Sequence, residues 1–146
     1  MTKYRLTDTR NAQGLYQIQA LKDIPSIGVK TGDLGGWIQT EGNLSQDGNC
    51  WVSENGQVSG NGRVFGNGQV SGNMTLSRRA FILDGLSRHA ITVADTLVSV
   101  GCEVLTINEW LAHAPEIGLK HGYSQKQIAE YLSAFKFIKF MMENYR

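Results

Sequence analysis

Apolar residues recur at a fixed interval of six along the middle of the chain. An interval of six is a multiple of the strand period of two and does not fit the helical period of 3.6. Each six-residue repeat, or hexad, therefore predicts a short extended segment that keeps its apolar residue on one constant face. The apolar positions of the hexads are Val52, Val58, Val64, Val70, Leu76 and Ile82.

Glycine marks a second fixed position in the hexads. Gly60, Gly66 and Gly72 each follow an apolar residue by two positions, and glycine allows a tight corner with positive φ at little cost. An asparagine follows each of these glycines, and asparagine also tolerates such geometry. One short strand and one corner, repeated, predict a solenoid in which three hexads give about 18 residues per coil.

The hexad phase changes at both ends of this segment. Upstream, Ile38, Leu44 and Cys50 form a set that is offset by two residues from Val52, which predicts a bulge or loop near Cys50. Downstream, Arg88 occupies the next apolar position and the phase is lost. The residues from 90 to 105 are still rich in β-formers, but the strand register between Arg88 and Leu105 stays open.

The flanking segments follow other periods. Residues 3–21 alternate between apolar and polar side chains around a turn at residues 11–14, which predicts a β-hairpin. Thr106 with Glu109 three residues later forms a capping box that is expected to begin a helix. Proline disfavours a helix interior, so Pro115 is expected to end this helix and open a second short one.

A longer helix is predicted over residues 125–144, where Ser124 and Gln127 repeat the capping box. One apolar stripe with helical spacing is expected to face the protein itself, and it includes Ile128, Leu132 and Phe135. The side chains that are left off this stripe and predicted to form a homodimer or partner contact are Phe137, Phe140 and Met141. Large exposed apolar patches mark interaction sites.

Two resemblances follow from these residues. The hexads over residues 50–85 resemble the left-handed β-helix of the hexapeptide-repeat superfamily. The whole chain is similar to a family of small phage and prophage proteins that are often labelled polymer-forming. The segments that carry this second resemblance are Lys3–Leu6, Gly32–Ile38, Asn43–Ser45, Glu109–Leu111 and Gly122–Ser124. The resemblance implies a phage-borne origin and brings no catalytic residue set.

These observations predict a mainly β fold in one compact unit. We expect a short left-handed parallel β-helix of three to four coils over residues 37–105. Residues 1–36 would form an N-terminal hairpin and cap, and residues 106–146 a C-terminal α-helical segment.

Composition narrows the classes of function. The chain has 146 residues, of which 17 are glycine, and a formal net charge of +1, which gives no general reason to expect nucleic-acid or membrane binding. We expect a cytoplasmic protein of the host cell, because the start of the chain shows no signal peptide. A weak basic edge at the end of the repeat is predicted to be solvated surface, and it consists of Arg78, Arg79 and Arg88.

The residues that could carry chemistry are few. A hexapeptide-repeat acyltransferase would use a histidine base between subunits, and His89, His113 and His121 are the candidates. Surface or helix-end roles suit all three better, and no coenzyme A site is recognisable. Cys50 and Cys102 lie far apart with no ligand at metal-binding spacing, so both are expected to be buried, inert thiols. We therefore predict no catalytic residue, cofactor or metal.

The sequence favours a non-catalytic protein-interaction module of phage origin. Our specific hypothesis is an inhibitor that binds a host defence complex in the manner of anti-CRISPR proteins and forms a homodimer through its C-terminal helix. The alternatives are a hexapeptide-repeat acyltransferase and a self-assembling structural protein.

Overall fold

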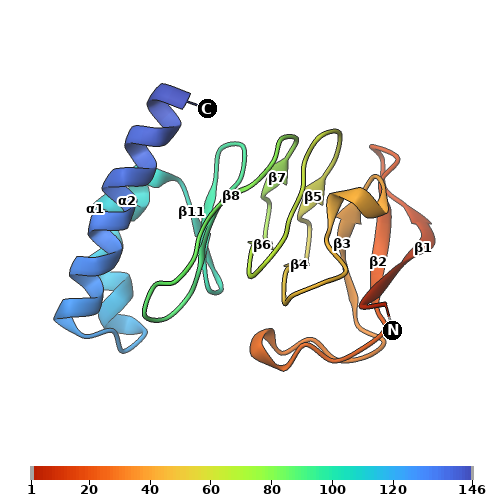
Figure 1. Cartoon of the computed structure of the whole chain (residues 1–146), viewed down its shortest axis with the longest axis horizontal. Helices are drawn as coiled ribbons and strands as arrows, with labels where there is room; N and C mark the ends of the chain where they lie inside the picture. Colours follow the sequence, from red (N-terminus) through yellow and green to blue (C-terminus); the bar gives the residue numbers. More distant parts are fainter. Residues whose placement is uncertain (1, 146) are drawn as a thin grey trace.

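Eleven strands and two α-helices follow one another along the long axis of the molecule in the computed structural model, which describes residues 2–145 (Figure 1). The strands are β1 (Tyr4–Arg10), β2 (Tyr16–Ala20), β3 (Leu34–Ile38), β4 (Trp51–Val52), β5 (Gln57–Val58), β6 (Gln69–Val70), β7 (Thr75–Leu76), β8 (Phe81–Leu83), β9 (Ile91–Val93), β10 (Val98–Val100) and β11 (Glu103–Leu105). The helices are α1 (Ile107–Lys120) and α2 (Gln125–Tyr145).

The predicted N-terminal hairpin is confirmed. Strands β1 and β2 pair antiparallel, and β2 also pairs antiparallel with β3. The Lys3 side chain is buried at this end of the molecule, and its Nζ donates to the carbonyl oxygen of Cys50 at 2.7 Å. The Tyr4 hydroxyl donates to the carbonyl oxygen of Leu44 at 2.6 Å. Both bonds tie the hairpin to the first hexads.

The hexads form short parallel rungs. Trp51 pairs with Gln69 and Val58 pairs with Leu76, so each residue lies beside the one eighteen positions later. The hexad valines Val58, Val64 and Val70 are fully buried in one core, because the period of six returns each of them to the same face.

The corners between the rungs also repeat every six residues. The backbone φ is positive at Gly48, Glu54, Gly60, Gly66 and Gly72. The predicted glycine corners are therefore confirmed. An asparagine follows each of these five corners, but none of these asparagines adopts positive φ, since Glu54 is the one non-glycine residue within residues 2–145 that does so.

The prediction of a regular left-handed parallel β-helix of three to four coils is wrong. The parallel rungs are two residues long, and from β8 onward the chain forms a four-stranded antiparallel sheet in the order β11-β10-β9-β8. The hexad phase ends at Ile82, and after it short turns connect successive strands. Two successive strands joined by a short turn can pair with each other only in the antiparallel direction. The sequence left the strand register between Arg88 and Leu105 open. In the structure, Val98 lies opposite both Val93 and Leu105.

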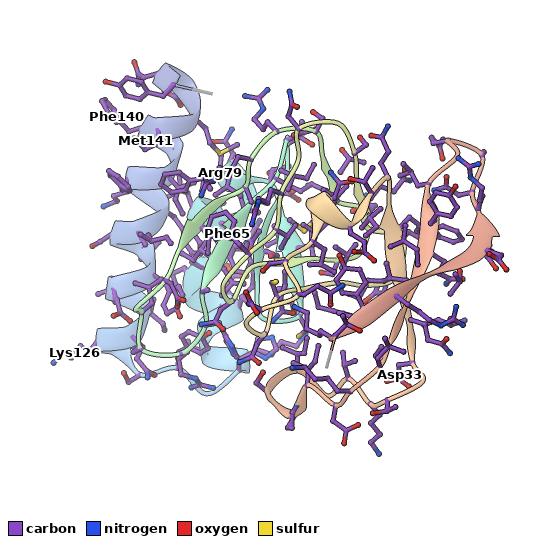
Figure 2. All side chains as sticks on the ribbon, turned by 45° about the vertical axis from the view of Figure 1, so that its right-hand side comes forward. Asp33, Phe65, Arg79, Lys126, Phe140 and Met141 are labelled. Atoms are coloured by element: carbon purple, nitrogen blue, oxygen red, sulfur yellow. The ribbon has the colours of Figure 1, made fainter. Side chains whose placement is uncertain are left out.

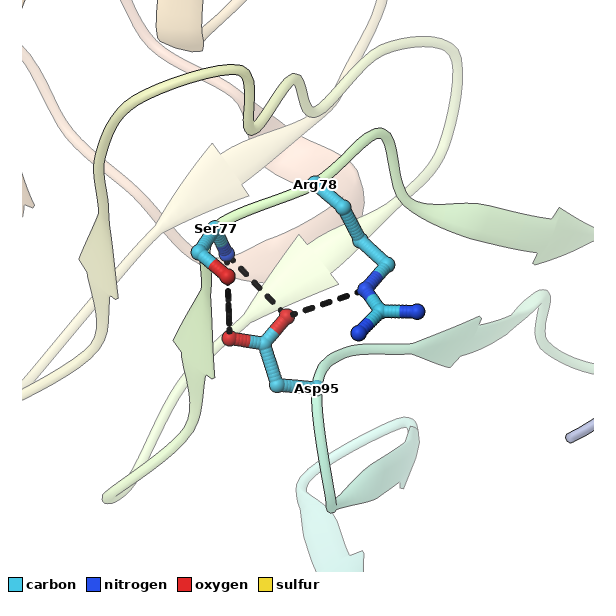
Figure 3. Close-up of polar contacts among 3 residues, drawn as sticks. All are labelled: Ser77, Arg78 and Asp95. Carbon is cyan, nitrogen blue, oxygen red and sulfur yellow. Dashed lines mark hydrogen bonds and ion pairs between the residues drawn. The ribbon is translucent and has the colours of Figure 1, made fainter. Parts of the chain in front are cut away.

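A carboxylate joins the parallel rungs to the antiparallel sheet (Figure 3). Asp95, in the turn between β9 and β10, accepts hydrogen bonds from the Ser77 hydroxyl at 2.8 Å and from the Ser77 backbone N–H at 3.1 Å. The Arg78 Nε lies 3.9 Å from the same carboxylate. The end of the repeat is therefore fixed against the β9–β10 turn.

Helix α1 begins as predicted but does not end at Pro115. Thr106 and Glu109 form the expected capping box. The helix continues through Pro115 to Lys120, so the predicted break is wrong. Trp110 and Ala114, which precede the proline on α1, are buried in the core formed with the sheet, and this packing keeps the turn helical despite the proline.

Helices α1 and α2 cover the antiparallel sheet at one end of the molecule (Figure 1). The Trp110 indole N–H donates to the carbonyl oxygen of Val98 at 2.8 Å, and its ring stacks on Phe135 at 5.0 Å. This packing forms a second core, separate from the core of the hexads. Within residues 2–145, neither helix combines the length and the apolar character that a membrane crossing needs.

Candidate functional site

The C-terminal half of α2 presents aromatic side chains to solvent. Phe137 is 48% exposed and Phe140 is 55% exposed, whereas Ile128 and Phe135 on the same helix are buried. The predicted division of α2 into an inward stripe and an outward set therefore agrees with the burial of these side chains. Met141 is half-buried beside them. Figure 2 shows Phe140 and Met141 near the C-terminal end of α2, far from Asp33 at the other end of the molecule.

One of the two exposed phenylalanines also contacts the neighbouring sheet. The Phe137 ring lies 6.2 Å from that of Phe81 on β8, and the Phe140 ring lies 6.2 Å from that of Tyr145. An ion pair between Lys139 and Glu143, at 3.8 Å, is also on this helix. We call the surface formed by Phe81, Phe137, Phe140 and Met141 the α2 surface.

The three arginines of the predicted basic edge have different surroundings. Arg78 faces Asp95, and the Arg79 guanidinium lies 4.9 Å from the centre of the Phe65 ring. Arg88 belongs to the loop between β8 and β9, and its guanidinium reaches the turn between the two helices, where it stacks on Tyr123 at 4.4 Å. Each arginine therefore contacts groups of the protein itself.

The three candidate histidines are separated into two locations. His113 lies on the exposed side of α1, with its Nδ1 3.7 Å from a Glu116 carboxylate oxygen. His89 and His121 line one cavity of about 80 Å³ between the β10–β11 turn and the two helices. The apolar part of this cavity is formed by residues that include Trp110, Ile117 and Ile128.

The polar groups around this cavity are tightly held. The Tyr131 hydroxyl donates to the His89 carbonyl oxygen and accepts from the His89 N–H, both at 2.6 Å. Burial lowers the pKa of His89, and the neighbouring Arg88 and His121 lower it further. Burial likewise raises the pKa of Tyr123 to about 12. These shifts favour a neutral imidazole and a neutral phenol beside the cavity.

Three potential ligand atoms lie at the polar edge of the cavity. Cys102 follows β10, Glu103 begins β11, and His121 caps the C-terminus of α1. One donor atom from each residue lies within 4.8 Å of the other two. The His121 Nε2 is 3.2 Å from the Glu103 Oε1. We call this group the Cys102 cluster.

The cluster corrects one prediction from the sequence. Cys50 is buried as expected, but Cys102 is exposed, because Gly101, with a φ of 56°, turns the chain outward between β10 and β11. Sequence spacing missed the cluster because His121 is distant from Cys102 along the chain. The available signals were the turn glycine before Cys102 and the histidine at the end of a capped helix.

Comparison with protein-family models and with curated proteins finds no match to this chain. The phage-family resemblance therefore stays a prediction.

Proposed function

We propose that the protein is a non-catalytic, phage-borne interaction module that acts in the cytoplasm of the host cell. In this proposal it forms a homodimer through the α2 surface and inhibits a host defence complex in the manner of anti-CRISPR proteins. The observation that supports protein binding is the presence of two phenylalanines, about half exposed, one turn apart on α2. The phage origin and the choice of target rest on the sequence resemblance.

The energetics of the α2 surface favour burial against a protein. Fully burying a phenylalanine side chain stabilises a contact by roughly 1.5–3 kcal/mol. Phe137 and Phe140 are each about half exposed, so an isologous pair of these surfaces would gain several kcal/mol from the four rings. A twofold axis brings the same patch from both subunits together, which is the commonest way to cover an apolar surface.

The oligomeric state tests the first part of the proposal. We expect the wild-type protein to sediment as a dimer and Phe140→Glu to sediment as a monomer, because a carboxylate in the contact would be desolvated without a partner. Lys126→Glu is the matched control, since Lys126 is exposed at the opposite end of α2 (Figure 2). A wild-type monomer would contradict the homodimer.

Phage infection tests the second part. Expression of the wild-type protein in a bacterium with active CRISPR interference should raise the plaquing efficiency of a targeted phage. An unchanged plaquing efficiency in strains of every interference type would contradict the defence-inhibitor proposal. Phe140→Glu should lose the effect if the dimer is the active form, whereas Lys126→Glu should keep it.

A further inference from the structure

We propose that Cys102, Glu103 and His121 bind a divalent cation of the Zn²⁺ class at the edge of the cavity beneath α1. This inference concerns residues outside the α2 surface and does not depend on the proposed interaction function. It rests on the convergence of a sulfur, an oxygen and a nitrogen donor within 4.8 Å of one another.

The donor set selects the metal. Thiolate, imidazole and carboxylate are the three protein ligands of Zn²⁺, whereas Mg²⁺ and Ca²⁺ prefer oxygen ligands alone. At the usual Zn–S, Zn–N and Zn–O lengths, donors around a tetrahedral ion lie about 3–4 Å apart. The 3.2 Å between the His121 Nε2 and the Glu103 Oε1 already meets this spacing.

A metal site explains the arrangement better than a catalytic triad does. In a triad, the nucleophile and the orienting carboxylate contact opposite nitrogens of the imidazole. In the Cys102 cluster, a single nitrogen of His121 lies within 4.8 Å of both the thiol sulfur and a carboxylate oxygen. All three donor atoms are therefore close enough together to coordinate a single ion.

The backbone around the ligands is held in place. Glu103 pairs with Val100 in the β10–β11 hairpin. The His121 N–H donates to the Ile117 carbonyl oxygen at 3.1 Å, and its own carbonyl oxygen accepts from an Arg88 Nη at 3.3 Å. Binding therefore requires side-chain rotation with little movement of the backbone. Fixed backbones reduce the ordering cost of binding.

Charge and coordination number define the kind of site. The thiolate and the carboxylate together carry two negative charges, which balance the charge of a divalent ion. They also offset the repulsion between that ion and the neighbouring Arg88 guanidinium. Three protein ligands leave one tetrahedral position, and an open fourth position distinguishes zinc sites that bind water or a small ligand from structural ones. The adjacent cavity is the space into which that fourth ligand would extend.

Metal titration of the reduced full-length protein tests the proposal. We expect Co²⁺ to produce a thiolate-to-cobalt charge-transfer band, and Zn²⁺ to displace Co²⁺ with a single ion bound per chain. Bound Zn²⁺ should also raise the melting temperature, because it binds the folded state. The absence of the cobalt band in the reduced wild-type protein, or a failure of Zn²⁺ to bind, would overturn the proposal.

Variants identify the ligands. Cys102→Ser should abolish the charge-transfer band, and His121→Gln and Glu103→Gln should each weaken Zn²⁺ binding by at least about tenfold. His113→Gln is the matched control, since His113 lies on α1 beside a carboxylate but belongs to no group of three potential metal ligands within residues 2–145. Circular dichroism should show native spectra for all four variants, because the ligands are at least partly exposed. Equal Zn²⁺ affinity in Cys102→Ser and the wild type would assign the metal elsewhere.

Discussion

The two halves of the molecule differ in how regularly the chain is built and in where side chains from distant residues meet. In the parallel rungs, a corner with positive φ follows two residues after each of four buried hexad residues, which are Val52, Val58, Val64 and Val70. In the antiparallel half, a sheet packs against two helices, and the ends of these elements bring together residues that are distant in sequence. Regular repetition therefore stabilises one half, whereas the candidate chemistry lies at the irregular junctions of the other.

The largest expected effect tests whether the hexads form a core. Val64→Asp should lower the free energy of unfolding by more than about 4 kcal/mol, because it buries a carboxylate without a partner. Urea unfolding followed by circular dichroism measures the loss. Arg63→Asp shifts the same substitution by one residue to an exposed position and should cost less than about 0.5 kcal/mol. A folded, cooperative Val64→Asp variant would show that the buried face is wrongly assigned.

A pair of glycine substitutions compares the two halves directly. A Cβ at Gly62 would stand 2.6 Å from the backbone oxygen of Leu76, whereas at Gly118 it would stand 2.7 Å from the Ile128 side chain. A neighbouring rung cannot move independently, so Gly62→Ala should cost about 1–3 kcal/mol in thermal or urea unfolding. Gly118→Ala should cost less, because Ile128 can rotate and alanine favours the helix by about 1 kcal/mol. Equal losses would contradict this difference between the halves.

The corner positions allow a stabilising substitution. Glu54 adopts a φ of 55° at a place in the repeat where the other corners are glycine. Left-handed backbone costs an L-residue about 1–2 kcal/mol, and the flexibility of glycine in the unfolded chain offsets part of the gain. Glu54→Gly should therefore raise the free energy of unfolding by about 0.5–1 kcal/mol.

The reverse substitution at an equivalent corner is the control. Gly66→Ala introduces a Cβ at a φ of 59° without any atom within 4 Å, so its cost should come from the backbone alone. It should lower the melting temperature, while Glu54→Gly raises it. If both substitutions lower the melting temperature, the corner at Glu54 is not strained.

How far the sequence predicts this fold differs between the halves for a physical reason. A period of six is compatible with only one assignment of the side chains that face the core, so the buried valines and the glycine corners were predictable. Strands β9 and β10 are three residues long and are buried on both faces, and such strands show no alternation from which to deduce pairing. The antiparallel sheet was missed for that reason.

The candidate sites differ in the same way. The outward set on α2 follows from helical spacing within one element, so Phe137 and Phe140 could be identified from the sequence. The Cys102 cluster depends on where α1 ends relative to the β10–β11 turn. That relation depends on tertiary structure. Pro115 was the local signal for a helix end, but α1 continues through it to Lys120, the residue before His121.

The smallest expected effect depends on pH and belongs to the helical half. The Thr106 N–H donates to the Glu109 Oε1 at 3.0 Å, and this bond to the charged form lowers the pKa of Glu109. In the unfolded chain, Glu109 binds a proton at a higher pH than it does in the folded protein. Its stabilising contribution is therefore complete above about pH 4.3 and is lost as the pH falls through the lowered folded pKa.

Glu109→Gln tests this contribution, since glutamine can keep the capping hydrogen bond but does not titrate. Thermal melts at neutral and acidic pH should show a smaller loss of melting temperature on acidification in Glu109→Gln than in the wild type. Glu116→Gln is the matched control because Glu116 is exposed on the same helix outside the capping box, and it should respond to acid as the wild type does. An equal response in all three proteins would mean that α1 depends on packing alone for its stability.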